Sequence, residues 1–192
     1  MNIVNIYTDG ACAGNQSEEN VGGWGCVLEY AGREKELCGG EVNTTNNRME
    51  LTALAQALSA LKKDGLRLHI YSDSSYLVNC FRAGWYESWR KNGWKTSKKT
   101  PVENRGLWEE ILAVLEKNKP NFYLVKGHQH LKEGGEAENA AAFRRFKDHN
   151  GDGFSYERFA QIVDYNNRCD ALANVFIKEH RAQQEDAATD IQ

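Results

Sequence analysis

Apolar and polar residues follow two periodicities along this chain, one typical of strands and one typical of helices. Short runs rich in β-branched and aromatic residues predict five strands, at residues 2–10, 24–30, 33–38, 66–71 and 121–125. Apolar residues at helical spacing predict helices at residues 46–63, 74–81, 107–115, 137–147 and 156–178. Ala31 and Gly32 separate the second and third strands, so these two are expected to form a hairpin, with the polar third strand at a sheet edge.

The order of these elements indicates an α/β protein. Three consecutive strands without helices between them should pair antiparallel, and strands reached through helices should run parallel to the first. We therefore predict an open mixed sheet flanked by helices. The 192 residues suffice for one domain, which we assign to residues 1–180, followed by a polar tail at residues 181–192 that we expect to be disordered.

Composition and charge narrow the setting in which the chain works. Hydrophobic content of 41% and charged content of 27% are typical of globular proteins, and no apolar run reaches bilayer-spanning length, so we expect no membrane partner. The five cysteines are scattered and form no CxxC pair, which favours reduced thiols in the cytoplasm over disulfides or a zinc site. The net charge is −3, yet residues 82–105 hold seven basic residues against two acids, a local balance that suits a polyanion.

Four acidic residues stand at positions where they can share a site. Asp9 and Asp73 end the first and fourth predicted strands, and the carboxyl ends of neighbouring parallel strands meet at one edge of a sheet. Glu50 lies on the border of the leucine-rich face of its helix, and Asp170 lies within the last helical segment. Acids pressed together raise one another's pKa, and a hard divalent cation such as Mg²⁺ relieves the repulsion. On spacing alone, each acid is more often a cap, a turn residue or a solvated charge.

Five segments resemble, in the same order, the successive motifs of bacterial ribonuclease HI, the type 1 RNase H family. They read YTDGACAGN (residues 7–15), TTNNRMEL (44–51), YSDSSY (71–76), VKGH (125–128) and NRCDALA (167–173), and they span nearly the whole chain. The resemblance implies an RNase H-like fold whose five strands lie in the order 3-2-1-4-5. It also implies an endoribonuclease that hydrolyses the RNA strand of RNA–DNA hybrids and leaves 5′-phosphate and 3′-hydroxyl ends.

The resemblance also assigns the catalytic residues. Asp9, Glu50, Asp73 and Asp170 match the four carboxylates that hold two Mg²⁺ ions, with Mn²⁺ as a substitute. His128 matches the histidine that assists proton transfer or product departure, for which imidazole is suited near neutral pH. A lone histidine is more often a surface or packing residue, and His130 is a nearby rival that we rank lower.

A larger set of residues is expected to contact the hybrid. Near the carboxylates and in the basic segment, these are Asn15, Thr45, Asn46, Asn47, Ser75, Trp85, Trp89, Lys91, Trp94, Lys95, Thr96, Lys98 and Lys99. The segment 82–105 resembles the basic protrusion that grips the DNA strand, and we choose Thr96 with the neighbouring Trp94 and Lys95 for a DNA-phosphate pocket. Helix capping and core packing are the alternatives for the Thr45 to Asn47 group and for the tryptophans. Ser75 stands where the bacterial family often has Gln, which leaves one minor-groove contact open.

The chain departs from the family pattern between His128 and Asp170, which are 42 positions apart instead of being joined by a short loop. We expect residues 131–165 to form a helical insertion before the last helix, with phenylalanines packing its turn. Residues 148–154 open like a calcium-binding EF-hand loop, but Phe159 occupies the twelfth position, where a bidentate Glu is needed. A helical hairpin is therefore favoured over a structural calcium site.

Three functions remain open at this point. A metal-dependent nuclease is favoured because all four carboxylates are present, whereas a hybrid-binding module without turnover would tolerate the loss of one. A calcium-responsive regulatory domain is opposed by the missing Glu at the twelfth loop position. We expect the chain to act as a monomer on an RNA–DNA hybrid duplex.

Overall fold

The computed structural model describes residues 3–14 and 20–189. Within these ranges, five strands and six helices follow one another: β1 (Ile3–Ala13), β2 (Val21–Tyr30), β3 (Arg33–Val42), α1 (Asn46–Ser59), β4 (Arg67–Ser72), α2 (Ser75–Arg82), α3 (Trp85–Lys91), α4 (Arg105–Leu115), β5 (Lys119–Leu124), α5 (Glu136–Asn150) and α6 (Tyr156–Thr189). Most boundaries lie within a few residues of those expected from the sequence, although α1 already ends at Ser59.

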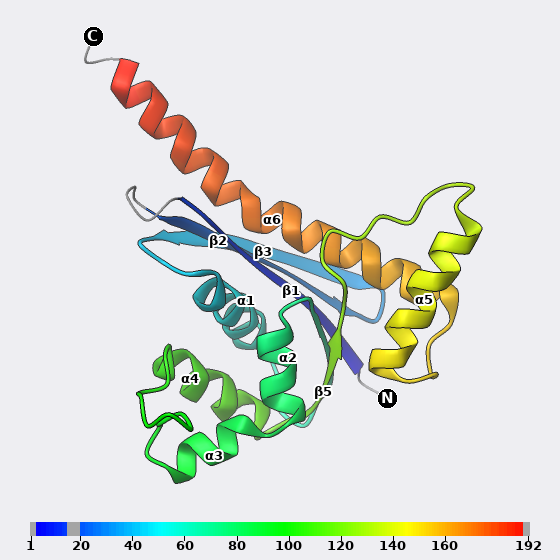
Figure 1. Cartoon of the computed structure of the whole chain (residues 1–192), viewed down its shortest axis with the longest axis horizontal. Helices are drawn as coiled ribbons and strands as arrows, with labels where there is room; N and C mark the ends of the chain where they lie inside the picture. Colours follow the sequence, from blue (N-terminus) through cyan, green and yellow to red (C-terminus); the bar gives the residue numbers. More distant parts are fainter. Residues whose placement is uncertain (1–2, 15–19, 190–192) are drawn as a thin grey trace.

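The strands form one mixed sheet in the order β3-β2-β1-β4-β5, which confirms the predicted order (Figure 1). The pairs β1–β2 and β2–β3 are antiparallel, whereas β4 and β5 continue the sheet parallel to β1. Ala31 and Gly32 form the expected hairpin turn, both with positive φ, and the polar strand β3 lies at one edge.

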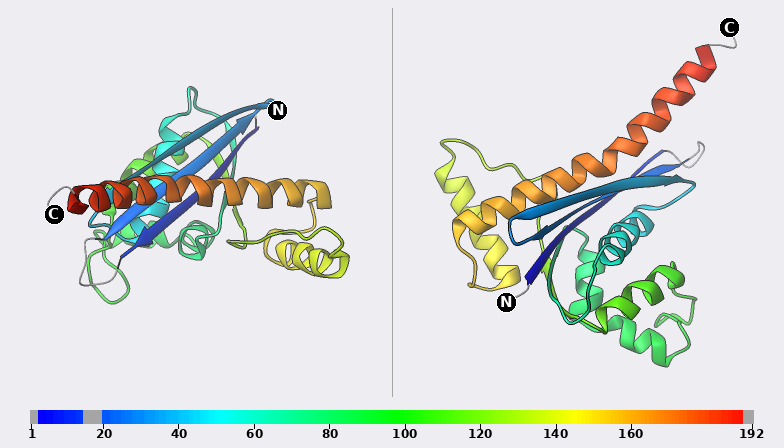
Figure 2. Two further views of the ribbon diagram at one scale, coloured as in Figure 1. Left: turned by 90° about the horizontal axis from the view of Figure 1, so that it is seen from above. Right: turned by 180° about the vertical axis from the view of Figure 1, so that it is seen from behind.

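Helices cover the two faces of this sheet with separate cores. One core joins the sheet to α1, α2 and α4, and Trp108 of α4 is fully buried in it. The other core lies under α5 and α6, where Tyr165 of α6 stacks on Tyr7 of β1 and continues a row of tyrosines across the sheet. The views from above and behind show α6 crossing the sheet on the face opposite α1 (Figure 2).

Strand β1 is longer than the sequence indicated, and the prediction that Asp9 ends it is wrong. The antiparallel ladder with β2 continues from Asp9 opposite Gly25 to Ala13 opposite Val21. The glycine at position 25 also lets α6 lie directly on the sheet, since a Cβ there would come within 2.4 Å of the Cys169 carbonyl oxygen. Only the parallel ladder with β4 stops just before Asp9, at Thr8 opposite Ser72.

The helical insertion forms the predicted hairpin of α5 and the start of α6. Phe146 and Phe159 pack against each other at its turn, with ring centroids 5.2 Å apart, and Phe143 and Phe154 surround them. The EF-hand-like interpretation of residues 148–154 is not supported, because Asp148 to Asn150 are the last turn of α5 and Asp152 pairs with Lys147 at 3.2 Å.

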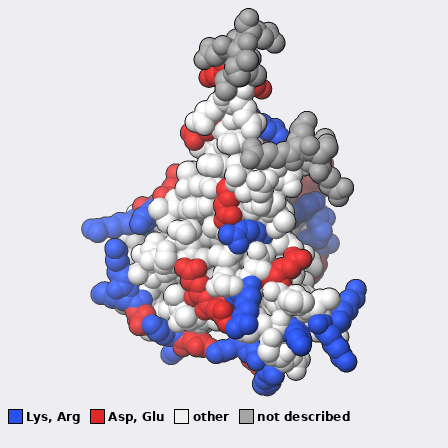
Figure 3. Space-filling view, turned by 90° about the vertical axis from the view of Figure 1, so that its left-hand side faces the viewer, with Lys and Arg blue, Asp and Glu red and all other residues white. Residues whose placement is uncertain are grey.

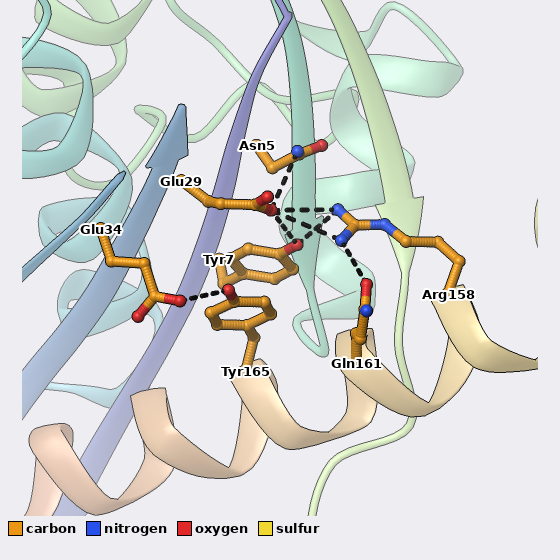
Figure 4. Close-up of polar contacts among 7 residues, drawn as sticks. All are labelled: Asn5, Tyr7, Glu29, Glu34, Arg158, Gln161 and Tyr165. Atoms are coloured by element: carbon orange, nitrogen blue, oxygen red, sulfur yellow. Dashed lines mark hydrogen bonds and ion pairs between the residues drawn. The ribbon is translucent and has the colours of Figure 1, made fainter. Parts of the chain in front are cut away.

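A polar network ties the start of α6 to the sheet. The Arg158 guanidinium donates to the Tyr7 hydroxyl at 2.6 Å and lies 3.4 Å from the Glu29 carboxylate, which also accepts from Asn5 (Figure 4). Tyr165, two turns further along α6, donates to Glu34 of β3 (Figure 4). The insertion is therefore anchored on β1, β2 and β3.

The polar C-terminal segment differs from its prediction. Helix α6 continues through Thr189, so the expected disorder is wrong for residues 181–189, and residues 190–192 lie outside the described part of the chain. The long helix extends beyond the sheet in Figure 1. No helix in the described ranges is both long and apolar enough to cross a bilayer.

Candidate active site

Two carboxylates of the site come from neighbouring parallel strands. Asp9 follows Thr8 on β1 and Asp73 follows Ser72 on β4, and these two preceding residues are register partners. Asp73 is succeeded by Ser74, whose hydroxyl accepts from the Leu77 amide and caps α2. The acids thus meet at the carboxyl edge of the parallel ladder, as the sequence predicted.

The third carboxylate comes from the first turns of α1. Thr45 caps this helix by accepting from the Arg48 amide at 3.3 Å, so the capping role considered for it is present. Gly10 permits α1 to approach β1, because a Cβ at that position would lie 2.3 Å from the Glu50 amide nitrogen. This contact of backbone on backbone is what brings Glu50 beside Asp9.

Asp9, Glu50 and Asp73 converge closely enough to share a cation. Each offers a carboxylate oxygen, and these oxygens all lie within 4.8 Å of one another. Asp9 and Glu50 are only 5% and 4% exposed. Glu50 Oε2 and Asp73 Oδ1 are buried and accept no hydrogen bond from any described residue.

This crowding changes the acidity of all three groups. Burial, followed by repulsion from Asp73 and Asp170, raises the pKa of Asp9 to about 8. Burial, with the charges of Asp73 and Asp9, raises the pKa of Glu50 well above its usual range. Burial also raises the pKa of Asp73, while the neighbouring His128 lowers it.

Asp170 and His128 stand at the border of this group. Asp170 is not one of the three acids within the 4.8 Å limit, but it lines the same cleft and its charge acts on Asp9 and Asp73. His128 Nδ1 lies 3.6 Å from Asp170 Oδ2, and its side chain is 78% exposed. The His128 backbone has a φ of +50°, a left-handed conformation, in the turn after β5.

The donor set fits a hard divalent cation. All the converging groups are carboxylates, and two of their oxygens are buried without a hydrogen-bond partner among the described residues. Buried acceptors of this kind are costly unless a positive charge faces them, and Mg²⁺ and similar ions prefer oxygen ligands. Asp9, Glu50 and Asp73 would hold such an ion, with Asp170 beside them.

Part of the predicted nucleic-acid-binding set lines the same cleft, which encloses about 510 Å³. Asn46, Asn47 and Ser75 are exposed on its walls next to the carboxylates. Asn15 lies outside the described residues. Asn174 also lines the cleft and was not among the predicted residues; its amide donates to the backbone and side-chain oxygens of Asp170 at 2.8 and 3.2 Å. The spacing of four residues after Asp170 on a helix was the available signal.

The basic segment divides into a packed part and an exposed part. Trp89 and Trp94 are buried in the core, whereas Trp85 is 41% exposed. The three arginines are engaged within the protein: Arg82 with α5 and β5, Arg90 with Glu116, and Arg105 with Glu109.

The exposed part of this segment carries the lysines. Lys91, Lys95, Lys98 and Lys99 are exposed and form no ion pair with any residue in the described ranges. The loop that carries Lys95, Lys98 and Lys99 is stabilised by a hydrogen bond between the hydroxyls of Thr96 and Thr100, which are 2.8 Å apart. In Figure 3, Lys and Arg side chains extend along the lower edge of the molecule, interspersed with acids.

This fold and this site define an α/β protein with a carboxylate cluster for divalent cations at the edge of a mixed sheet. The RNase H family model matches residues 1–145, which include Asp9, Glu50 and Asp73. The chain therefore belongs to the RNase H family and is a ribonuclease H enzyme.

Individual proteins show how far the similarity extends. The chain is 43% identical over 183 residues to a ribonuclease H of Thermoanaerobacter pseudethanolicus, covering 95% of both chains. It is 50% identical over 141 residues to the ribonuclease H of Moorella thermoacetica, covering 73% of this chain and 90% of that one. Asp170 lies beyond the residues that the family model matches.

Solved structures give the same result for the fold. The crystal structure of LC9-RNase H1, a type 1 RNase H with the type 2 active-site motif, is 28% identical with a TM-score of 0.59, covering 86% of this chain and 85% of that one. A foamy viral protease-reverse transcriptase, solved in complex with RNA/DNA hybrid, shares the fold over 72% of this chain and 19% of that one, at 18% identity and a TM-score of 0.52.

Proposed function

We propose that the chain is an endonuclease that hydrolyses the RNA strand of RNA–DNA hybrids and leaves 5′-phosphate and 3′-hydroxyl ends. The observation that carries this proposal is the convergence of Asp9, Glu50 and Asp73 in an open cleft, with Asp170 and His128 at its border. Membership of the RNase H family supports the substrate class.

The proposed cofactor is Mg²⁺, bound as two ions with substrate, and Mn²⁺ is the expected substitute. When bound, such ions polarise the phosphodiester and make a coordinated water more acidic. Asp9, Glu50 and Asp73 would hold the cations, and Asp170 of α6 would complete the set of carboxylates. The unpaired oxygens of Glu50 and Asp73 support this arrangement.

His128 is proposed to move a proton at the edge of the cleft. Its ring is exposed and 3.6 Å from Asp170, so it can exchange protons with solvent and with a leaving group near that carboxylate. Because it lies outside the buried trio, its loss should reduce turnover without abolishing cation binding.

The binding surface is proposed to extend from the cleft to the basic segment. Asn46, Asn47 and Ser75 line the cleft as neutral groups suited to the minor groove or to 2′-hydroxyls. Lys91, Lys95, Lys98 and Lys99, with Thr96, are proposed to contact phosphates of the DNA strand. Trp85 is exposed enough to join them, whereas Trp89 and Trp94 act through packing.

Cleavage of end-labelled substrates tests the activity. With Mg²⁺, the wild type should cut an RNA–DNA hybrid in its RNA strand and leave single-stranded RNA and duplex DNA intact, and EDTA should stop the cutting. Asp9→Asn keeps the shape of the side chain but removes a negative ligand, so it should lose activity. Equal cutting by wild type and variant would rule out the carboxylate mechanism.

The alternative of a hybrid-binding module without turnover makes a different prediction. Such a protein would bind the hybrid with the same affinity in Mg²⁺ and in EDTA and would yield no products. We also propose that the chain acts as a monomer in the cytoplasm. Its five cysteines are free thiols, which supports a reducing compartment, and sedimentation at micromolar concentration tests the oligomeric state.

A further inference from the structure

A second cavity lies beside the carboxylate cleft, between β5 and the inserted helix α5. It encloses about 330 Å³, and its lining residues include Asp73 and Ser75, which also line the cleft. Leu124 and Val125 lie on the β5 side, and Phe146 lies on the α5 side. The cleft and this cavity therefore adjoin at Asp73 and Ser75.

The walls of this cavity are joined by direct hydrogen bonds. The Asn150 side chain accepts from the Leu124 amide at 2.9 Å and donates to the Leu124 carbonyl at 2.8 Å, so it continues the ladder at the edge strand. Arg82 binds the carbonyl oxygens of Phe122 and His149 and thus joins the same two elements. These hydrogen bonds fix the spacing between α5 and β5 in the absence of a ligand.

The polar groups around the cavity are suited to an anion. Arg145 of α5 and Lys126 after β5 both line it, both are exposed, and neither forms an ion pair with a described residue. Gln129 also lines it, and Gln129 Nε2 is a buried donor without an acceptor among the described residues. Asp73 is the only acid in the described lining, and it belongs to the cation-binding group.

We propose that this cavity binds a backbone phosphate of the hybrid next to the cut site, held by Arg145, Lys126 and Gln129. The apolar wall of Leu124 and Phe146 accommodates the adjoining sugar, while the guanidinium and ammonium groups pair with the phosphate oxygens. The inserted helix thereby extends the substrate-binding surface on the α5 side of the carboxylates, away from the basic segment of α3 (Figure 1). This inference rests on the proposed function for the identity of the ligand.

Arg145→Ala tests the subsite, and Arg144→Ala is its matched control. Arg144 precedes Arg145 on α5 and is likewise exposed and without an ion pair in the described structure, but it does not line the cavity. Binding of a fluorescent RNA–DNA hybrid is measured in EDTA, where no cutting occurs, over a series of salt concentrations. Arg145→Ala and Lys126→Ala should each raise the Kd about tenfold, as expected when a charge-assisted hydrogen bond to phosphate is removed.

The salt dependence shows whether the removed side chain binds a phosphate. Each of these two variants should lower the slope of log K against log salt by about one, whereas Arg144→Ala should leave slope and Kd nearly unchanged. A neutral methylphosphonate at the phosphate that Arg145 binds should weaken the wild type and have no further effect on Arg145→Ala. Equal Kd values for Arg145→Ala and Arg144→Ala would overturn the subsite.

Failure of the subsite and failure of the proposed function remain distinguishable. If the wild type cuts the hybrid with Mg²⁺ but Arg145→Ala binds as Arg144→Ala does, only the subsite is wrong. If the wild type binds the hybrid through Arg145 and yields no products, the subsite stands and the nuclease assignment is wrong. Circular dichroism of each variant checks that the exposed substitutions leave the fold intact.

Discussion

The side chains of Asp9, Glu50 and Asp73 are held where their own charges are disfavoured. Burial raises the pKa of each group, and mutual repulsion adds to this for Asp9 and Glu50. The backbone contact at Gly10 and the register of β1 with β4 fix the backbone positions from which these side chains converge. The fold thus holds three carboxylates together although the ionised form of each is disfavoured, an arrangement that suits a divalent cation.

The first prediction concerns the pH dependence of stability without divalent cations. The pKa of Asp9 is about 8 in the folded protein, against an ordinary value of 3.8, so the folded state keeps a proton that the unfolded state has lost. The stability that the protonated Asp9 contributes to the folded state is fully present below the unfolded pKa of 3.8 and is lost as the pH rises through 8. In EDTA, the free energy of unfolding should therefore fall toward pH 8, by at most about 1.4 kcal/mol per pH unit from this group.

Urea unfolding in EDTA at several pH values measures this effect. Asp9→Asn removes the titrating group, so the variant should be more stable than the wild type at pH 8 and should show a weaker pH dependence. At pH 8, Mg²⁺ should raise the free energy of unfolding of the wild type more than that of the variant, because the cation binds the ionised carboxylates. Parallel pH profiles for wild type and Asp9→Asn in EDTA would contradict the prediction.

The candidate residues differ in how well the sequence could reveal them. Asp9 and Asp73 each come at the end of an apolar strand run, and Glu50 lies at the border of the apolar face of its helix. Once the sheet order was known, these local patterns predicted that the three acids converge. Gln129 carries no such pattern. Its unpaired amide becomes a candidate only because Gln129 lines the cavity between α5 and β5. That cavity forms between elements distant in sequence, so the pattern of a single segment cannot predict it.

At the scale of elements, the inserted helix α5 is attached to the sheet by its last residue. Asn150 makes two hydrogen bonds to the backbone of Leu124 and accepts a third from Arg82 at 2.7 Å. An edge strand normally leaves such backbone groups to water. Here a side chain substitutes for a neighbouring strand and fixes the position of the helix.

The second prediction removes this attachment. Asn150→Ala should lower the free energy of unfolding by about 1–3 kcal/mol, because the Leu124 backbone groups and Arg82 lose partners in a partly buried place. The Leu124 amide should also exchange its hydrogen faster, which places the effect at the edge of β5. Asp148→Ala, an exposed position on the same helix, is the control and should change stability by no more than about 0.5 kcal/mol.

The elements themselves show which features are local. Periodicity predicted the five strands and all the described helices except α3, mostly within a few residues. The helix between β1 and β4 predicted their parallel pairing. The β1–β2 ladder is longer than predicted because it contains glycines, which are more typical of turns than of strands. Gly10, Gly22 and Gly23 all pair in the ladder. Polarity alone likewise led us to predict disorder for residues 181–192, of which residues 181–189 instead continue α6.

At the scale of the whole molecule, charge is distributed unevenly around a net value of −3. The arginines of the basic segment are engaged in internal contacts, which leaves the lysines as its exposed cations. Three of them, Lys95, Lys98 and Lys99, lie within five residues on the loop that Thr96 and Thr100 stabilise. This loop therefore offers a local positive surface, which suits a polyanion, even though the chain as a whole is acidic.

The third prediction tests whether this surface binds phosphates. Replacing Lys95, Lys98 and Lys99 by Ala should raise the Kd for the hybrid and lower its salt slope by about 0.9 for each phosphate that is no longer neutralised, while turnover at saturating hybrid stays near the wild-type value. The matched control replaces Lys35, Lys62 and Lys63, three exposed lysines around a separate groove near the first residues of β1. Both triple variants have the same net charge, so a general effect of charge would weaken binding equally. A large effect confined to the first variant assigns phosphate binding to the loop, and a fall in turnover with unchanged Kd would exclude a binding role.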